Sequence, residues 1–281
     1  MKRFIILVAV ASLPFITLSC KKKGTKPEET TTPVPTETTP VNLLKLGETF
    51  ITGSAAKAVI YGTREPVTGY NEIYVALFDS LDGSQLSRGH FDVLPMMDMG
   101  TMQHSAPVEN TEDTTTTNGY FKSAVIFSMP GTSSQWWLDL SFHNHKNGKS
   151  GIGKLGVTVK ASSPNLFKST VVAADNNSSI FLSYVNPLKP VVGINDFEVV
   201  LNKKKNMMEY MPVDDYTIEI EPTMPSMGHG SPNNVNPSLT SKGHYKGKVN
   251  FTMSGLWRIT LKLYKNGTLV SSDQYFEITI E

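Results

Sequence analysis

Alternating hydrophobic and polar residues dominate the chain from about residue 42 to its end. An apolar side chain at every second position is typical of a strand that buries one face. No window of the sequence shows sustained helical periodicity. The predicted strands are residues 70–78, 120–127, 137–142 and 156–160, followed by 179–184, 197–201, 216–220, 245–251, 257–263 and 275–280.

Tight turns separate several of these strands. Asp82-Gly83 and Asn266-Gly267 are dipeptides that favour β-hairpins, because their residues tolerate positive φ. Short strands at this spacing, without helices, predict antiparallel sandwiches. We therefore expect an all-β fold of two tandem immunoglobulin-like antiparallel β-sandwich domains, residues 42–163 and 164–281, divided at the turn-rich stretch Ser162-Ser-Pro-Asn165.

Two methionine-rich loops indicate that the domains are two versions of one module. Met99-Gly-Thr-Met102-Gln-His104 and Met224-Pro-Ser-Met227-Gly-His229 share the spacing Met-x-x-Met-x-His, about 125 residues apart. The downstream sequence repeats as well. Phe127-Ser-Met129-Pro-Gly131 corresponds to Phe251-Thr-Met253-Ser-Gly255, and Trp137 corresponds to Trp257, with about four extra residues in the first turn.

The N-terminus reads as a targeting signal rather than as part of the fold. Lys2 and Arg3 precede an apolar stretch, residues 4–18, that is too short to span a bilayer stably. This stretch leads to Cys20, the single cysteine of the chain, as in bacterial lipoprotein signals. The alternative is an ordinary secretory signal in which the cysteine stands by coincidence.

We expect a lipoprotein signal peptide over residues 1–19 and lipidation of Cys20. A tether rich in Thr, Pro and Glu follows over residues 20–41, and its composition is too polar to offset the entropy of ordering. The mature protein is thus predicted to be lipid-anchored to a bacterial membrane outside the cytoplasm, in the periplasm or at the cell surface.

Composition narrows the function. The 26 Lys and Arg residues nearly balance the 25 Asp and Glu residues, which argues against a nucleic-acid surface. The sequence has no nucleophile elbow, phosphate loop or prominent carboxylate pair, so we expect no enzyme. Because the one cysteine stands at the lipid site, any soft metal ligand has to be a methionine.

The methionines and histidines of the two loops form candidate metal sites. A thioether is a soft ligand that holds Cu(I) and discriminates against Zn(II) and Mg(II), and imidazole accepts copper in either oxidation state. A strand methionine brought near by the fold would complete three or four ligands. The predicted ligands are Met224, Met227, His229 and Met253 in the second domain, and Met99, Met102, His104 and Met129 in the first, with Met97 as an alternative there.

The second domain resembles the YtkA-like domain, which is related to the periplasmic part of FixH-like proteins. The resemblance rests on Met224-Pro-Ser-Met227-Gly-His229, Gly243-His-Tyr245-Lys-Gly and Val249-Asn-Phe-Thr-Met253-Ser-Gly255-Leu-Trp257, and covers roughly residues 191–281. The first domain is similar in outline but has drifted, which favours the second as the better site. The resemblance implies copper handling or assembly of copper-containing oxidases, with a copper enzyme or another envelope protein as partner.

We therefore expect a membrane-anchored extracytoplasmic protein that binds copper, Cu(I) rather than Cu(II), for buffering or delivery. The alternative is a non-catalytic surface lipoprotein that binds a protein or glycan through strand-face residues such as Trp136. In that case the loop methionines pack irregular gaps in the structure. His143 and His145 share one strand face and form a weaker metal hypothesis, while Met207, Met208 and Met211 are interpreted as loop packing.

Overall fold

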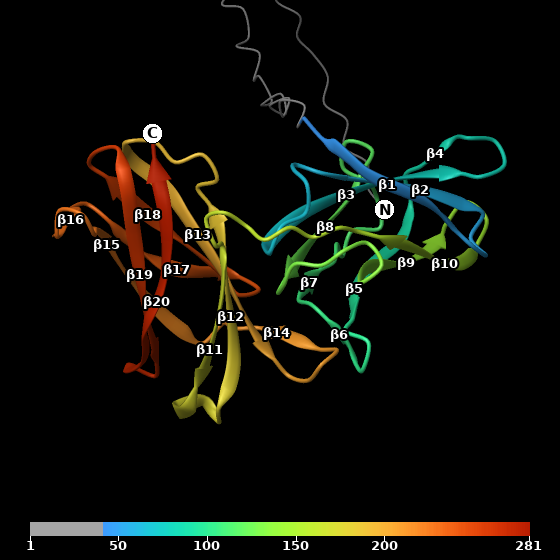
Figure 1. Ribbon diagram of the computed structural model, residues 1–281. Coiled ribbons are helices and arrows are strands. Elements are labelled where there is room, and N and C mark those ends of the chain that lie inside the picture. Colours follow the sequence, from blue (N-terminus) through green and yellow to red (C-terminus); the bar gives the residue numbers. More distant parts are fainter. Residues whose placement is uncertain (1–41) are drawn as a thin grey trace, which may run out of the picture. The chain divides into compact units, whose positions relative to one another are not determined.

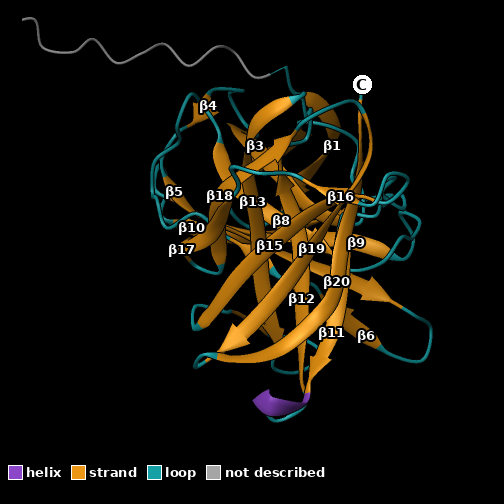
Figure 2. Cartoon of the chain, turned by 90° about the vertical axis from the view of Figure 1, so that its left-hand side faces the viewer, coloured by secondary structure: helices purple, strands orange, loops and turns teal. Residues whose placement is uncertain are grey.

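Strands and short connections make up nearly all of the computed structural model, which describes residues 42–281 (Figures 1 and 2). The signal peptide, Cys20 and the tether predicted for residues 1–41 lie outside the described residues. The only helical segment among the described residues is one turn of 3-10 helix, η1 (Ala173–Asp175), drawn purple in Figure 2.

The first half of the chain forms two antiparallel sheets. One sheet has the strand order β1-β2-β3-β8-β7, with β4 paired to β3, and the other has the order β10-β9-β5-β6. The strands are β1 (Leu44–Ile51), β2 (Ala56–Gly62), β3 (Gly69–Asp79), β4 (Gln85–Leu86), β5 (Gly89–Asp98), β6 (Gln103–Ser105), β7 (Val108–Glu109), β8 (Phe121–Phe127), β9 (Trp136–Asn144) and β10 (Lys149–Gly156).

The second half repeats this arrangement. Its sheets have the orders β11-β12-β13-β18-β17, with β14 paired to β13, and β16-β15-β19-β20. Each strand takes the place of the strand ten numbers before it. The strands are β11 (Phe167–Val172), β12 (Ser178–Asn186), β13 (Gly193–Lys204), β14 (Tyr210–Pro212), β15 (Tyr216–Met224), β16 (His229–Gly230), β17 (Val235–Ser241), β18 (His244–Phe251), β19 (Gly255–Lys265) and β20 (Thr268–Ile280).

Each half buries its own hydrophobic core. On β15, Tyr216, Ile218 and Ile220 are buried, while the side chains between them face solvent, as the alternating pattern requires. Separate clusters of buried residues fill the two halves, one around Trp136 and one around Trp257. The predicted all-β fold of two immunoglobulin-like sandwiches is confirmed by these four antiparallel sheets.

Besides the short β4, β6 and β7, the sequence failed to predict β1, β2 and β5 of the first sandwich, and it placed a strand at residues 156–160 where the structure has β10 at Lys149–Gly156. β1 is largely exposed and β2 is buried at most of its positions, so neither shows a clear alternation. β5 alternates through Phe91 and Val93 but ends in Pro95-Met-Met97, which obscures the pattern. This omission matters, because β5 carries one of the candidate metal ligands.

Candidate metal centre

A two-stranded hairpin places a methionine directly opposite a histidine in each sandwich. In the first sandwich β5 pairs with β6 so that Met97 faces His104. In the second, β15 pairs with β16 so that Met224 faces His229. Both methionines are buried, with only 4% of their surface exposed. The hairpins therefore present the same pair of potential ligands in the same register.

This register corrects the sequence alignment of the two loops. The shared Met-x-x-Met-x-His spacing aligns Met99 with Met224, but Met97 is the residue that occupies the position of Met224. The first loop is two residues longer between the paired positions, so the matching spacing does not reflect matching backbone. Met97, the alternative ligand in the prediction, is thus the structural counterpart, and Met99 is exposed in the loop.

A buried tryptophan anchors the turn that carries the third methionine. Trp136 Nε1 donates to the main-chain oxygen of Met129 at 3.1 Å, and Trp257 Nε1 donates to that of Met253 at 3.0 Å. Trp136, and not Trp137, is therefore the counterpart of Trp257. Neither indole is exposed to solvent, so each fixes its turn from inside the core.

The histidine of each hairpin packs against this tryptophan. The His104 and Trp136 rings meet edge to face at 5.5 Å, and the His229 and Trp257 rings do so at 6.0 Å. His104 Nδ1 lies 2.8 Å from the main-chain oxygen of Ser105, and His229 Nδ1 lies 3.1 Å from that of Gly230. A carbonyl oxygen only accepts, so Nδ1 carries the proton in both rings.

The Nε2 lone pair is consequently the free coordinating atom of each imidazole. His104 is 5% exposed, and its Nε2 is buried without a hydrogen-bond partner. An orphaned buried acceptor costs free energy, so its presence calls for an explanation. A ring whose Nδ1–H bonds a carbonyl and whose Nε2 is free matches the usual arrangement of a metal-bound histidine.

The hairpin methionine also reaches the turn that holds the third methionine. A Cβ added to Gly255 would lie 2.4 Å from Met224 Cε, so the Met224 methyl rests on that glycine, two residues after Met253. In the first sandwich, a Cβ on Gly131 would lie 3.2 Å from Met97 Cε. In each sandwich the buried methionine thus contacts the glycine of this turn, and the indole contacts both the histidine ring and the main chain of the turn methionine.

The remaining predicted ligands lie at the surface. Met102 and Met227 are in the hairpin loops and exposed, and Met253 is exposed as well, while Met129 is partly buried against the first core. Exposed loop methionines could still close over an ion, because loops and their side chains rearrange readily.

The β13–β14 hairpin contacts the first site, although its methionines were interpreted from the sequence as loop packing. The main-chain N–H of Ser105, next to His104, donates to Met207 O at 2.8 Å, and Tyr210 Oη donates to Ser105 O at 3.0 Å. The β13–β14 hairpin, with exposed Met207 and Met208, therefore lies beside the first site. The sequence shows the cluster of methionines near Tyr210, but it does not show that the fold brings this cluster next to His104.

The tryptophan pair provides no sugar-stacking platform. Trp136 is fully buried, which is incompatible with the alternative in which it contacts a partner. Trp137 is also buried, because Lys154 Nζ lies 3.6 Å from the centre of its ring and Asp139 accepts its indole N–H at 3.0 Å. Both indoles are therefore engaged within the first sandwich.

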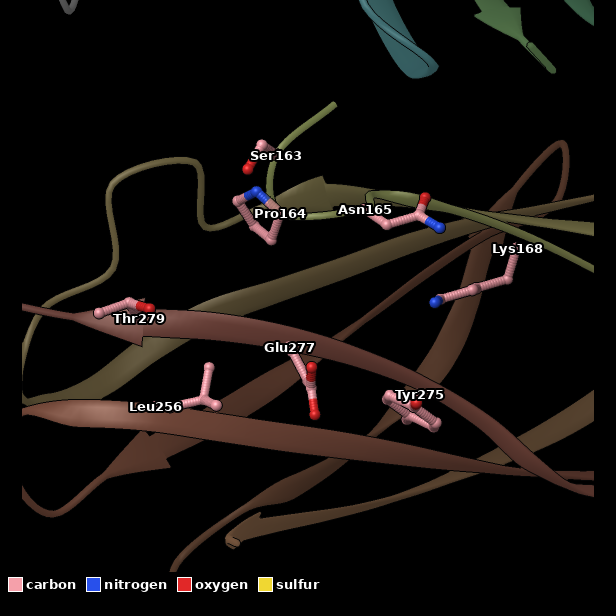
Figure 3. A pocket seen from close by; sticks show the side chains of 8 residues that line it. All are labelled: Ser163, Pro164, Asn165, Lys168, Leu256, Tyr275, Glu277 and Thr279. Atoms are coloured by element: carbon pink, nitrogen blue, oxygen red, sulfur yellow. The ribbon is translucent and has the colours of Figure 1, made fainter. Parts of the chain in front are cut away.

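A separate hollow lies on the second sandwich (Figure 3). Its volume is about 450 Å³, and Tyr275 and Glu277 of β20 project into it. Lys168 and Arg258 lie 5.0 and 4.2 Å from the Tyr275 ring centre, so their charges are engaged with the aromatic face. None of the predicted metal ligands lines this hollow.

No group of three or more His, Cys, Asp or Glu side chains among residues 42–281 stands in a ready metal-holding arrangement. Within the same part of the chain, no helix is long and apolar enough to cross a membrane.

Several solved structures are similar to this chain. The bacterial integrin-binding protein invasin is 15% identical, with a TM-score of 0.25, over 80% of this chain and 38% of its own. The Escherichia coli adhesin FdeC is 14% identical, with a TM-score of 0.26, over 83% of this chain and 66% of its own. Domains 5–6 of the S-layer protein SbsC are 12% identical, with a TM-score of 0.27, over 85% of this chain and 97% of their own.

By sequence, the chain matches a known family over part of its length. No curated protein matches the chain. The family described as YtkA-like matches residues 173–262, which run from η1 almost to the end of β19. The match contains the Met224–His229 hairpin, Met253 and Trp257. The YtkA-like domain predicted from the sequence is therefore confirmed in the second sandwich.

Proposed function

We propose that this protein binds Cu(I) at one methionine–histidine site in each sandwich, and that it buffers the ion or delivers it to a copper enzyme. In this proposal the chain is held at a bacterial membrane, outside the cytoplasm, through a lipid on Cys20. The observation that carries the proposal is the buried His104 Nε2, which has no partner and lies on a hairpin that pairs His104 with Met97.

The donor set suits Cu(I). Thioether sulfur is soft and neutral, so it stabilises the monovalent ion and gives little to hard cations. Met97 and Met224 lie at the buried end of each set, and His104 and His229 each offer a neutral Nε2. The indole of Trp136 or Trp257 covers one side of each proposed site. It excludes water there and so disfavours oxidation of Cu(I) to the more strongly hydrated Cu(II).

Each residue has a distinct role in holding the ion. The hairpin backbone fixes the separation of methionine and histidine, and the hydrogen bond from Nδ1 fixes the tautomer. The indole N–H holds the turn of Met129 or Met253 in place. The exposed Met102 and Met227 would add a ligand from the solvent side, which makes release possible without unfolding the sandwich.

The test is a Cu(I) titration of the full chain, without oxygen, against a chromophoric Cu(I) chelator. We expect two equivalents bound, falling to one in either His104→Ala or His229→Ala and to none in the double variant. X-ray absorption at the copper edge should show mixed sulfur and nitrogen neighbours. A double variant that keeps both equivalents would overturn the proposal.

A control separates these sites from general methionine binding. Met211→Leu removes an exposed thioether outside both hairpins and preserves the side-chain volume. It should leave the stoichiometry and affinity for Cu(I) unchanged. Loss of an equivalent in this variant would move the site to the β13–β14 hairpin.

A further inference from the structure

Three of the six histidines gather at the other end of β5 from the methionine–histidine hairpin. His90 lies near the start of β5 and Met97 near its end, so the two groups are separated by roughly 23 Å at about 3.3 Å per residue. His143 lies on β9 and His145 follows directly after that strand. We call these three residues the histidine cluster.

The sheet itself brings the cluster together. His90 and His143 are direct partners across the β5–β9 ladder, where opposite Cβ atoms are about 4.5–5.5 Å apart. His145 is two residues beyond His143 and so lies on the same face. The sequence shows His143 and His145 as a pair, but only the ladder adds the third imidazole from more than 50 residues away.

The ring separations suit one shared ion. The ring centres lie 4.9 Å apart for His90 and His145, 5.5 Å for His143 and His145, and 6.1 Å for His90 and His143. Three imidazoles on a tetrahedral ion, with metal–nitrogen distances of about 2.0–2.1 Å, have ring centres roughly 5 Å apart. The widest pair therefore has to close by about 1 Å to meet that geometry.

The backbone around the cluster is fixed. Asn144, between the two β9 histidines, is fully buried and donates to the main-chain oxygen of Ser54 at 3.0 Å. Its side-chain oxygen accepts from the N–H of Lys146 at 2.9 Å, which shapes the turn after His145. His143 Nδ1 lies 2.9 Å from Ser150 Oγ, so its Nε2 is left for a ligand. A fixed backbone with surface rings favours coordination after small rotations.

No group of three or more His, Cys, Asp or Glu side chains among residues 42–281 stands ready to hold a metal ion, so the histidine cluster has to rearrange when it binds one. His90 and His145 are exposed, and surface side chains change rotamer within nanoseconds, so the required rotations meet little resistance. Arg88 lies near enough to His145 for its charge to act on that ring. Lys146 is neutralised by Asp79 and Asp82. Arg88 is therefore the main charge opposing a cation.

We propose that His90, His143 and His145 form a three-imidazole site for a divalent transition-metal ion such as Zn²⁺, with a fourth position open to water. Neutral imidazole binds divalent zinc, copper and nickel, whereas this cluster lacks the thioethers that select Cu(I). The site is thus chemically distinct from the methionine–histidine hairpins, and it stands independently of the proposed copper function.

The experiment is a Zn²⁺ titration of the full chain at pH 7.5, by calorimetry and by competition with a chromophoric zinc chelator. We expect one equivalent bound with micromolar or tighter affinity. His90→Gln, His143→Gln and His145→Gln should each weaken it at least tenfold, and the triple variant should bind none. Co²⁺ loading should produce the visible absorption of a tetrahedral ion.

The matched control is His229→Gln, which removes one imidazole from the second hairpin. It should leave Zn²⁺ binding unchanged, and the triple cluster variant should keep both equivalents of Cu(I). Equal Zn²⁺ affinity in the wild type and the triple variant overturns the proposal, as does a wild type that binds no Zn²⁺. A His90→Gln variant with unchanged affinity also overturns it, because the cross-strand ligand would then have no role.

Discussion

His244 Nε2 lies 2.8 Å from Glu109 Oε1, and its Nδ1 lies 2.7 Å from Glu198 Oε1. One imidazole on β18 of the second sandwich thus bridges a carboxylate of each sandwich. Tyr70 Oη also donates to Glu109 at 3.0 Å, which leaves this carboxylate well satisfied. Both ring nitrogens face acceptors, so the bridge is complete only when His244 is protonated.

This bridge predicts a loss of stability at alkaline pH. Burial opposes the charged ring, but the hydrogen bonds to Glu109 and Glu198 outweigh it and raise the pKa of His244 to about 9, from 6.5. A raised pKa contributes stability that is full below pH 6.5 and is lost as the pH rises through 9. The loss should be at most about 3 kcal/mol. Urea unfolding followed by tryptophan fluorescence at pH 6.5 and 9.5 measures it.

His244→Gln should flatten this pH profile and lower the free energy of unfolding at pH 6.5 by about 1–3 kcal/mol, because Glu198 loses its nearest cation and keeps Lys246, at 3.4 Å, as the remaining one. Lys242→Gln is the control, since it breaks only the exposed pair with Glu112. We expect that change to stay within about 0.5 kcal/mol. A His244→Gln variant with the pH profile of the wild type contradicts the assignment.

Variants of Met97 and Met99 test whether the structural alignment or the sequence alignment of the first loop identifies the copper ligand. Met97→Leu should lower Cu(I) affinity at the first site by at least tenfold, because it removes the thioether opposite His104 and leaves the volume nearly unchanged. Met99→Leu, in the exposed loop, should have a smaller effect. Chelator competition gives both affinities. The reverse order would support the alignment by sequence spacing.

Gly255 tests the packing of the second site. Gly255→Ala places a Cβ 2.4 Å from Met224 Cε at a backbone φ of +121°, so the methionine has to move and the backbone is strained. We expect a loss of about 1–3 kcal/mol in stability and weaker Cu(I) binding at this site. Gly267→Ala, at φ +77° with open space, isolates the backbone effect. Equal Cu(I) affinity in both variants would show that Met224 is not a ligand.

Trp136 and Trp137 distinguish the structural alignment from the sequence alignment. Trp136→Phe should destabilise the first sandwich by about 2–4 kcal/mol, because it opens a cavity and leaves Met129 O without its donor. Trp137→Phe loses a contact with Lys154 and a hydrogen bond to Asp139, and should cost less. Thermal unfolding of the two variants ranks them, and the opposite ranking would restore Trp137 as the counterpart of Trp257.

Alternation along the chain was sufficient to predict the fold class, because strands such as β15 and β19 expose every second side chain. It was insufficient for β1, whose side chains are mostly exposed and show no clear period. The division into two sandwiches was predictable from the repeat of Met129 and Met253 with their downstream tryptophans.

The details of the site depended on facts that spacing does not contain. The partner of His104 is set by the length of its hairpin loop, and the first loop exceeds the second by two residues. The counterpart of Trp257 is set by which indole faces the core, and adjacent Trp136 and Trp137 look alike in sequence. His90 joins His143 only through pairing of distant strands.

The hydrogen bond from Ser105 to Met207 makes the two copies of the repeat unequal. It places a hairpin of the second sandwich next to His104, which is buried, whereas His229 at the equivalent position remains partly open to solvent. If the chain binds copper as proposed, its two sites exchange the ion at different rates. The first then serves as a slow store and the second as the point of transfer, so the duplication gives the movement of copper a direction.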